Sequence, residues 1–345
     1  MPPAAPGRAT ILTSGTTGAP KGAARSQPKN LDPVAALLSV IPLHARENTM
    51  IAAPMFHSWG FAHFTLGLAL CSTLVMRRKF DPEATLSLCA QHDCTALVVV
   101  PVMLQRILEL PDDTLTRYDI SDVRTVPVSG SALPPALSER WMDLFGENLY
   151  NLYGSTEVAW ATIATPQDLR EAPGTAGRPP RGTVMKLFDD EDREITQPGV
   201  TGRIFVGNDV QFEGYTGGGG KAEIGGLLSS GDVGHVDSEG RLFIDGRDDD
   251  MIVSGGENVF PSEVEDLLLG HENVSDVAVF GVEDEKFGQR LKAVIVKKGE
   301  LSERDVQDYV KAKLAGYKAP RDVEFVDELP RTSTGKVLKR ELRNL

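Results

Sequence analysis

Cysteine and histidine are scarce in this 345-residue chain, which has three of the former and six of the latter. Cys71, Cys89 and Cys94 are odd in number and show no paired spacing, which argues against a disulfide framework. The histidines show no metal-ligand spacing, so we expect no structural metal ion. We interpret the cysteines as reduced thiols in apolar surroundings.

Basic residues are also fewer than acidic residues. The chain has 36 Lys and Arg residues against 49 Asp and Glu residues, and its net charge is −13. Such a surface repels a phosphate backbone, so we expect no nucleic-acid partner. The first residues, Met1 to Pro6, contain no apolar signal region. We therefore expect a cytoplasmic protein.

Long hydrophobic runs are missing as well. The largely apolar stretch from Phe61 to Met76 is shorter than the roughly 20 residues that a membrane-spanning helix needs. It also carries polar residues, among them His63, Thr65 and Ser72. The stretch predicts a buried helix and no transmembrane segment.

What the chain does contain is a loop rich in small and hydroxylated residues, from Thr13 to Gly22. It holds four hydroxyls, three glycines and Lys21. Glycine lets backbone N–H groups approach an anion closely, hydroxyls donate to phosphate oxygens, and lysine adds a positive charge. The loop therefore predicts a phosphate site. Its candidate nucleotide-binding residues are Thr13, Ser14, Gly15, Thr16, Thr17, Gly18 and Lys21.

Two other interpretations of this loop fit less well. Pro20 precedes Lys21 where the Walker A pattern has a glycine, so the loop is not of that type. A flexible Gly/Thr linker should contain neither a lysine nor a proline.

Four further polar motifs follow in chain order. They are Tyr153–Glu157 (YGSTE), Ser229–Asp232 (SSGD), Gly246–Asp250 (GRDDD) and Pro330–Lys336 (PRTSTGK). With the first loop, these motifs resemble in kind and order those of the adenylate-forming superfamily of acyl-CoA synthetases, non-ribosomal adenylation domains and luciferases. The resemblance runs from Ile11 to about Arg340 and is closest to the fatty-acyl-CoA synthetases.

The hydrophobic pattern predicts an α/β protein in its first part. Short β-branched runs at Ala96–Val100 and Val123–Val128 read as buried parallel strands, with a helix from Val102 to Leu110 between them. From Gly182 to Ile244, short alternating strands predict a small antiparallel, barrel-like part.

The last hundred residues predict a compact α+β unit. We expect helices over Pro261–Leu269 and Ser302–Leu314, with Ser302 as N-cap, and strands at Val277–Phe280 and Leu291–Val296. We place an N-terminal domain at residues 1–246, a hinge at 247–250 and a C-terminal domain at 251–345. The resemblance implies the same layout, with a small mobile C-terminal lid.

One feature departs from the family pattern. The phosphate loop of the family lies well inside the N-terminal domain, but here it begins at Thr13. The resemblance therefore implies an N-terminally truncated member whose activity is open.

The resemblance also implies a reaction. A carboxylate attacks the α-phosphate of ATP, pyrophosphate leaves, and coenzyme A then displaces AMP from the acyl-adenylate. The implied substrates are a small-molecule carboxylic acid, with a fatty acid favoured, ATP and coenzyme A. Magnesium is the implied metal, and Glu157 its implied ligand, since Mg²⁺ prefers oxygen ligands.

The same resemblance suggests roles for the motif residues. Lys336 would bring positive charge to the α-phosphate, Thr156 would donate to it, and Asp232 and Arg247 would bind the ribose hydroxyls. Asp249 would be the hinge residue, and Lys336 a target of a lysine acetyltransferase. The remaining candidates for the nucleotide site are Tyr153, whose ring would face the adenine, Gly154 and Ser155.

The acyl and coenzyme A sites are less sharply marked. His57 lies in an aromatic motif without the aspartate that amino-acid-activating domains carry, which favours an uncharged acyl tail. The small residues Gly130, Ser131 and Ala132 would line an acyl channel. Gly255 and Gly256 match the pantetheine loop of the synthetases, although a plain Gly-Gly turn explains them equally well.

Two alternative functions stay open. The chain could be a catalytically impaired, nucleotide-binding fragment, or an adenylating enzyme for a different acyl or aryl carboxylate or a different acceptor. The presence of Lys336, Glu157 and Asp232 together favours an active ligase.

Overall fold

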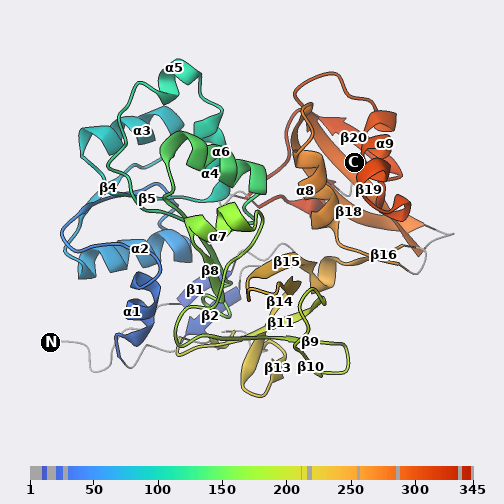
Figure 1. The fold of residues 1–345 in the computed structure, drawn as a ribbon, viewed down its shortest axis with the longest axis horizontal. Coiled ribbons are helices and arrows are strands. Elements are labelled where there is room, and N and C mark those ends of the chain that lie inside the picture. The colour runs from blue at the N-terminus through green and yellow to red at the C-terminus, as the bar shows by residue number, and fades with distance from the viewer. Residues whose placement is uncertain are drawn as a thin grey trace.

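A mostly parallel sheet forms the first part of the chain (Figure 1). The computed structural model describes residues 10–13, 21–25, 30–210, 212–215, 220–254, 257–284, 288–332 and 336–342. The strands of this sheet are β3 (Asn48–Ile51), β4 (Thr73–Met76), β5 (Ala96–Val98), β6 (Val126–Val128), β7 (Leu149–Tyr153) and the antiparallel β8 (Thr162–Ala164). They run in the order β4-β3-β5 and β6-β7-β8, and parallel bridges join β5 to β6. The predicted α/β class is confirmed.

Helices cover this sheet because its strands are apolar on both faces. The helices of this region are α1 (Asp32–Leu38), α2 (Ser58–Ala69), α3 (Pro82–Gln91), α4 (Pro101–Leu108), α5 (Asp112–Leu115), α6 (Pro135–Phe145) and α7 (Pro166–Glu171). Every residue of β5 and β6 is buried, and both strands pack in one hydrophobic cluster with Leu104, Ile107 and Trp141.

The predicted buried helix over 61–76 is only partly right, because Gly60, His63 and Gly67 are the buried residues of α2, while Phe61 and Leu68 are exposed. Helix α2 ends at Ala69, and the rest of the stretch turns into strand β4. Cys71 has a φ of 54°, which a helix cannot accommodate, and Thr73 and Val75 favour a strand. Cys89 and Cys94 are buried as expected, whereas Cys71 is exposed. Within the described residues, no helix is both long and apolar enough to cross a membrane.

A curled antiparallel sheet follows. Its strands are β9 (Val184–Phe188), β10 (Glu194–Ile195), β11 (Gly202–Gly207), β13 (Glu223–Ile224), β14 (Leu227–Val236) and β15 (Leu242–Arg247). They run in the order β10-β9-β11-β14-β13, with β15 on β14. This sheet confirms the expected antiparallel part and lies below the parallel sheet in Figure 1.

A small three-stranded sheet connects the start of the chain to this region. Strands β1 (Thr10–Thr13) and β2 (Lys21–Arg25) form an antiparallel pair in which Thr13 lies opposite Lys21. Strand β12 (Phe212–Tyr215) extends the pair along β2. The two ends of the predicted phosphate loop therefore lie side by side, while residues 14–20 lie outside the described part.

The C-terminal region is an α+β unit. Its strands are β16 (Ile252–Ser254), β17 (Glu257–Val259), β18 (Val274–Asp284), β19 (Gly288–Lys297) and β20 (Asp322–Val326), and its helices are α8 (Pro261–Leu269), α9 (Glu303–Lys313) and α10 (Lys339–Leu342). Val264 and Val306 belong to one buried cluster with the sheet. The Ser302 hydroxyl accepts a hydrogen bond from the backbone N–H of Asp305, which confirms it as the N-cap of α9.

Candidate functional site

A cavity of about 440 Å³ opens at the carboxyl ends of the parallel strands. Val100 follows β5, Ser129 and Gly130 follow β6, and Gly154 to Thr156 follow β7; all of them line the cavity. The carboxyl edge of a parallel sheet is where α/β proteins bind ligands, because the loops there diverge and leave a crevice. Helices α1 and α2 and the side chain of Lys336 complete its wall.

The loop after β7 is closely packed at Gly154 and is hydrogen-bonded within itself. A Cβ atom on Gly154 would lie 2.0 Å from the carbonyl oxygen of Ala159, so only glycine fits there. The Ser155 hydroxyl donates to Oε2 of Glu157 (2.9 Å) and accepts from the Glu157 backbone N–H (3.2 Å). These bonds hold the Glu157 carboxylate beside the cavity wall.

The same loop is tied to the sheet that carries the phosphate loop. The backbone N–H of Phe212, the first residue of β12, donates to the carbonyl of Glu157 (3.2 Å). Because β12 pairs with β2, and β2 begins at Lys21, the first and second motifs belong to one hydrogen-bonded framework. The predicted phosphate-loop residues Ser14, Gly15, Thr16, Thr17 and Gly18 lie outside the described residues.

A second polar group joins three motifs. The Tyr153 hydroxyl donates to Oδ2 of Asp232 (2.6 Å), and Nε of Arg247 lies 3.7 Å from Oδ1. Asp232 lies opposite Arg247 in the β14–β15 pair, which explains why these distant motifs meet. Burial raises the pKa of the Asp232 carboxyl, although the Tyr153 hydrogen bond and Arg247 oppose the shift. Burial, followed by the Asp232 charge, raises the pKa of Tyr153 well above its usual value.

Lys336 extends from the C-terminal region into this group. Its backbone N–H donates to the Thr332 hydroxyl (3.1 Å), and its carbonyl accepts from the Thr332 N–H (2.8 Å), so the turn is closed at its base. The side chain is open to the solvent of the cavity, yet surrounding protein desolvates the ammonium enough to lower its pKa. Arg247 lowers this pKa further, while Asp232 and Glu157 oppose the shift.

His57 lies at the same end of the cavity. It precedes the first residue of α2, and its ring packs against Phe56 with 4.6 Å between ring centroids. Partial burial lowers the pKa of His57, and the positive charge of Lys336 lowers it further. We call His57, Ser155, Thr156 and Lys336 the polar end of the cavity.

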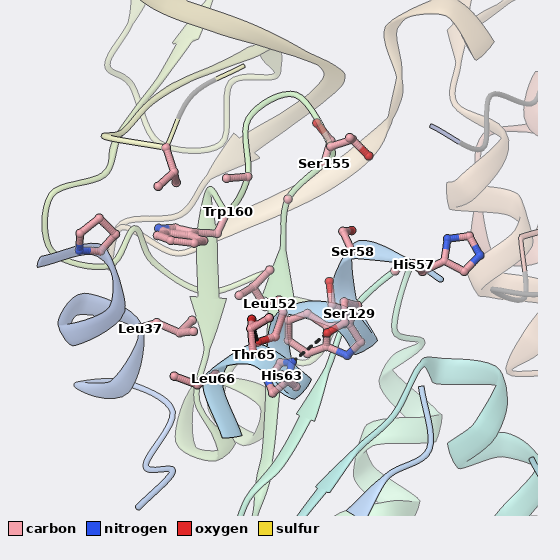
Figure 2. Close-up of a pocket in the computed structure, with 18 of the residues that line it drawn as sticks. Leu37, His57, Ser58, His63, Thr65, Leu66, Ser129, Leu152, Ser155 and Trp160 are labelled. Carbon is pink, nitrogen blue, oxygen red and sulfur yellow. Dashed lines mark hydrogen bonds between the residues drawn. The ribbon is translucent and has the colours of Figure 1, made fainter. Parts of the chain in front are cut away.

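The opposite end is apolar (Figure 2). Leu37 of α1 and Leu66 of α2 lie there, away from Ser155. The apolar and aromatic residues that line the cavity are Leu31, Pro33, Val34, Leu37, Pro54, Trp59, Ala62, Leu66, Ala69, Val100, Leu152, Ala159, Trp160 and Val210. We call Leu37, His63 and Leu66 the apolar end.

Not every candidate acyl-site residue reaches the cavity. Gly130 lines it and has a φ of 104°, a conformation that favours glycine, whereas Ser131 and Ala132 are not among the described lining residues. Asp249 lies in a short 3₁₀ turn, Asp248–Asp250, between β15 and β16. Gly255 and Gly256 lie outside the described residues.

Sequence reasoning missed the contribution of α2. Trp59, Ala62, His63, Leu66 and Ala69 line the cavity at the three- and four-residue spacing of one helical face. That spacing was visible in the sequence, but an apolar face gives no indication of whether it meets a core or a cavity.

Among the described residues that line the cavity, His63 is the one titratable side chain at the apolar end. It is 3% exposed, and its Nδ1 lies 3.1 Å from the carbonyl oxygen of Trp59. The rings of His63 and Trp59 pack edge to face, with centroids 4.2 Å apart. Burial lowers the pKa of His63 to about 4, and the bond to Trp59 opposes this only in part.

The His63→Leu variant should therefore change how stability depends on pH. In the native chain, the unfolded state takes up a proton near pH 6.5, whereas folded His63 stays neutral down to about pH 4. This histidine thus contributes stability above pH 6.5 that is lost as the pH falls towards 4, by up to about 3 kcal/mol. Urea unfolding at several pH values measures the difference.

The control for this measurement is His92→Gln, because His92 is exposed. We expect the native chain and the control to lose stability in parallel between pH 6.5 and 4, and His63→Leu to lose less. Equal slopes in all three proteins would contradict the assignment of a neutral, buried His63.

Comparison with known proteins shows that the chain matches two family models and is similar to several CoA ligases. Residues 8–216 match the family model described as AMP-binding enzyme, and residues 263–336 match the AMP-binding enzyme C-terminal domain. The chain is 35% identical to the indoleacetate–CoA ligase of Aromatoleum aromaticum, over 96% of this chain and 66% of that protein. It is 32% identical to a long-chain-fatty-acid–CoA ligase of Bacillus subtilis, over 96% and 60%.

A solved structure is similar as well. The o-succinylbenzoate CoA synthetase of Bacillus subtilis, in complex with its acyl-adenylate intermediate, superposes with a TM-score of 0.85 at 29% identity. The match covers 97% of this chain and 69% of that one. The chain thus spans about two thirds, or less, of the length of these relatives.

Proposed function

Because this chain belongs to the AMP-binding enzyme family, we propose that it activates a carboxylic acid with ATP and transfers the acyl group to coenzyme A. One observation carries the proposal. Arg247, Asp232 and Glu157 come from three separate motifs, yet all three act on the pKa of Lys336, a residue of a fourth motif that lines the polar end of a largely apolar cavity.

In the first step we propose that a carboxylate oxygen bonds to the α-phosphorus of ATP while the bond to the bridging oxygen breaks and pyrophosphate leaves. Negative charge accumulates on the phosphoryl oxygens, and preorganised cations and donors stabilise it. We assign this task to the Lys336 ammonium and the Thr156 hydroxyl. The desolvation that lowers the pKa of Lys336 also strengthens its attraction to such an anion.

We assign the ribose to Asp232 and Arg247. A carboxylate has lone pairs for about four hydrogen bonds, so Asp232 can accept from two ribose hydroxyls while Tyr153 occupies one position. In this arrangement Tyr153 positions Asp232 through its hydroxyl, and its ring is left for the adenine. The loop residues from Thr13 to Lys21 stay predictions for the β- and γ-phosphates.

Glu157 has the chemistry of a magnesium ligand. Mg²⁺ is bound by one or two carboxylates together with substrate phosphate oxygens. The part of the chain that the structure describes contains no group of three or more His, Cys, Asp or Glu residues that could hold a metal, so Glu157 would share the ion with ATP. Bound there, Mg²⁺ would neutralise charge on the phosphates.

In the second step we propose that the thiolate of coenzyme A bonds to the acyl carbon while the acyl–phosphate bond breaks and AMP leaves. A rotation of the C-terminal region about Asp249 would withdraw Lys336 and admit the thiol. The role of the Gly255–Gly256 loop in this step stays a prediction, as does acetylation of Lys336.

We propose that the substrate acid is apolar in the part next to its carboxylate group. Trp59 and Trp160 line the cavity with aliphatic side chains, which suits an aryl or a short acyl group. The names of the relatives include both aromatic and fatty acids. A fatty acid therefore stays one candidate beside an aryl-substituted acid, which the aromatic walls favour.

Acid-dependent exchange of labelled pyrophosphate into ATP tests the proposal. We expect exchange with at least one aryl-alkanoic or fatty acid, and formation of a coenzyme A thioester and AMP in equal amounts. ATP binding without exchange, across a panel of both acid types, would instead support the nucleotide-binding fragment.

A further inference from the structure

The apolar end of the cavity contains a polar atom without a partner. Nε2 of His63 is fully buried and makes no hydrogen bond within the described structure, although His63 lines the cavity. A buried acceptor or donor left unpaired costs about 1–3 kcal/mol, so such atoms usually have a partner. Because His63 lines the cavity, a ligand that fills this end is the nearest candidate for that partner, and it would reach Nε2 with a small shift of the neighbouring side chains.

The hydrogen bond at the other ring nitrogen decides what kind of partner fits. The carbonyl oxygen of Trp59 can only accept, so Nδ1 of His63 must carry the proton. Burial keeps the imidazole neutral at neutral pH, with a pKa of about 4. A neutral imidazole with its proton on Nδ1 has a lone pair on Nε2, which therefore accepts.

The ring cannot easily turn to avoid this role. Trp59 holds His63 twice, through its carbonyl oxygen and through edge-to-face packing of its ring. Trp59 is itself anchored, because its Nε1 donates to the carbonyl of Val99 (2.9 Å). The acceptor is thus preorganised by helix α2 and by Val99, the residue that follows strand β5.

Nε2 of His63 lies far from the polar end of the cavity, where we propose that the carboxylate of the substrate reacts. His63 is six residues after His57 on α2, which corresponds to about 9 Å along the helix axis. In Figure 2 it lies with Leu66 and Thr65 at the end opposite Ser155. The other polar side chain there is already paired, since the Thr65 hydroxyl donates to the carbonyl of Ala62 (2.9 Å).

We propose that His63 is a specificity residue, whose Nε2 accepts a hydrogen bond from an O–H or N–H group that the acid carries at the end remote from its carboxylate. Hydroxyaryl, indolyl and ω-hydroxyacyl acids have such a group. This inference rests on the proposed ligase function and specifies the substrate class of the same cavity.

Matched pairs of acids test it. Each pair differs only in a donor and its methylated form, as in 4-hydroxyphenyl and 4-methoxyphenyl acids of several chain lengths, indole-3-acetate and its N-methyl form, and ω-hydroxy and ω-methoxy alkanoates. We expect the native enzyme to prefer the donor by about tenfold to a hundredfold in kcat/KM for at least one pair, because the methylated acid leaves Nε2 unpaired.

Three variants separate the hydrogen bond from packing. His63→Leu should bring the ratio of the two acids close to one, and His63→Gln should restore part of it, since its amide oxygen can accept near the position of Nε2. His92→Leu makes the same substitution at an exposed histidine outside the cavity lining, so the ratio should stay at the native value.

The outcomes are distinct from those of the ligase test. If acids exchange pyrophosphate but no pair shows a preference, or the preference survives in His63→Leu, the inference is overturned and the ligase proposal stands. If no acid is turned over, calorimetric binding of the same pairs to the full chain measures the ratio directly. Equal affinities there would overturn the inference too.

Discussion

Replacing Lys336 by alanine should lower acid-dependent pyrophosphate release by about a hundredfold to a thousandfold, the usual cost of losing one group that stabilises developing charge. Among the described residues of the C-terminal region, Lys336 is the one that lines the cavity. Asp232 and Glu157 are close enough to raise the pKa of its ammonium group, against the effects of burial and Arg247. Its charge is matched to the crowded anionic transition state of the first step. Pyrophosphate release with a saturating acid measures the loss.

The same variant should retain most of the second step. Thioester formation from a supplied acyl-adenylate needs the C-terminal region in another orientation, where Lys336 has left the phosphate. Lys298→Ala is the control, because Lys298 is an exposed lysine of the same region outside the cavity. Equal loss of both steps in Lys336→Ala would show that this lysine acts on the structure of the site instead.

Replacing Asp232 by asparagine should have opposite effects on catalysis and stability. Hydrogen bonds to a charged group contribute about 1.5–3 kcal/mol, so losing the carboxylate should raise KM for ATP by about tenfold to a hundredfold. The folded chain without ATP should become more stable at neutral pH. KM from initial rates and the free energy of unfolding in urea measure the two effects.

The sign of the stability effect follows from the pKa. Burial raises the pKa of Asp232 above its unfolded value of 3.8, so the folded state holds its proton to higher pH than the unfolded state. Ionised Asp232 thus costs stability, and the cost appears as the pH rises through and above 3.8. The gain in Asp232→Asn should be absent below this range and complete at neutral pH.

Tyr153→Phe provides the matched comparison. It removes the hydrogen bond to Oδ2 but leaves the carboxylate, so KM for ATP should rise less than in Asp232→Asn. The variant should also be less stable than the native chain, because the buried carboxylate then loses the hydrogen bond from Tyr153. An unchanged KM in Asp232→Asn would remove this residue from the nucleotide site.

Local patterns predicted much of the framework. The strands around Val98 and Val128 and the helix that begins after Ser302 are found as expected, because β-branched runs and N-caps act over a few residues. The same local reasoning failed at Cys71, where a residue with positive φ ends helix α2 and starts the turn into β4. Side-chain hydrophobicity does not report on backbone conformation at a single residue.

The motif residues show what the sequence could indicate and what only the tertiary structure could show. Tyr153 and Asp232 are 79 residues apart, and their hydrogen bond exists only because the end of strand β7 lies beside the middle of strand β14. Their residue types and order along the chain indicated a family, but not this contact. Gly130 lines the cavity, whereas Ser131 and Ala132 are not among the described lining residues, so a joint role of the three in an acyl channel stays a prediction.

The sequence by itself determined the α/β class, the family resemblance and the residue types at the polar end, because these depend on local composition and on the order of motifs. Tertiary structure alone decided that one face of α2 meets a cavity instead of a core, and that Nε2 of His63 is buried with no hydrogen-bond partner among the described residues. The physical reason is that burial, desolvation and hydrogen-bond satisfaction depend on atoms from several distant segments. A histidine in an apolar helix has the same local sequence whether its second nitrogen is satisfied by the protein or left for a ligand.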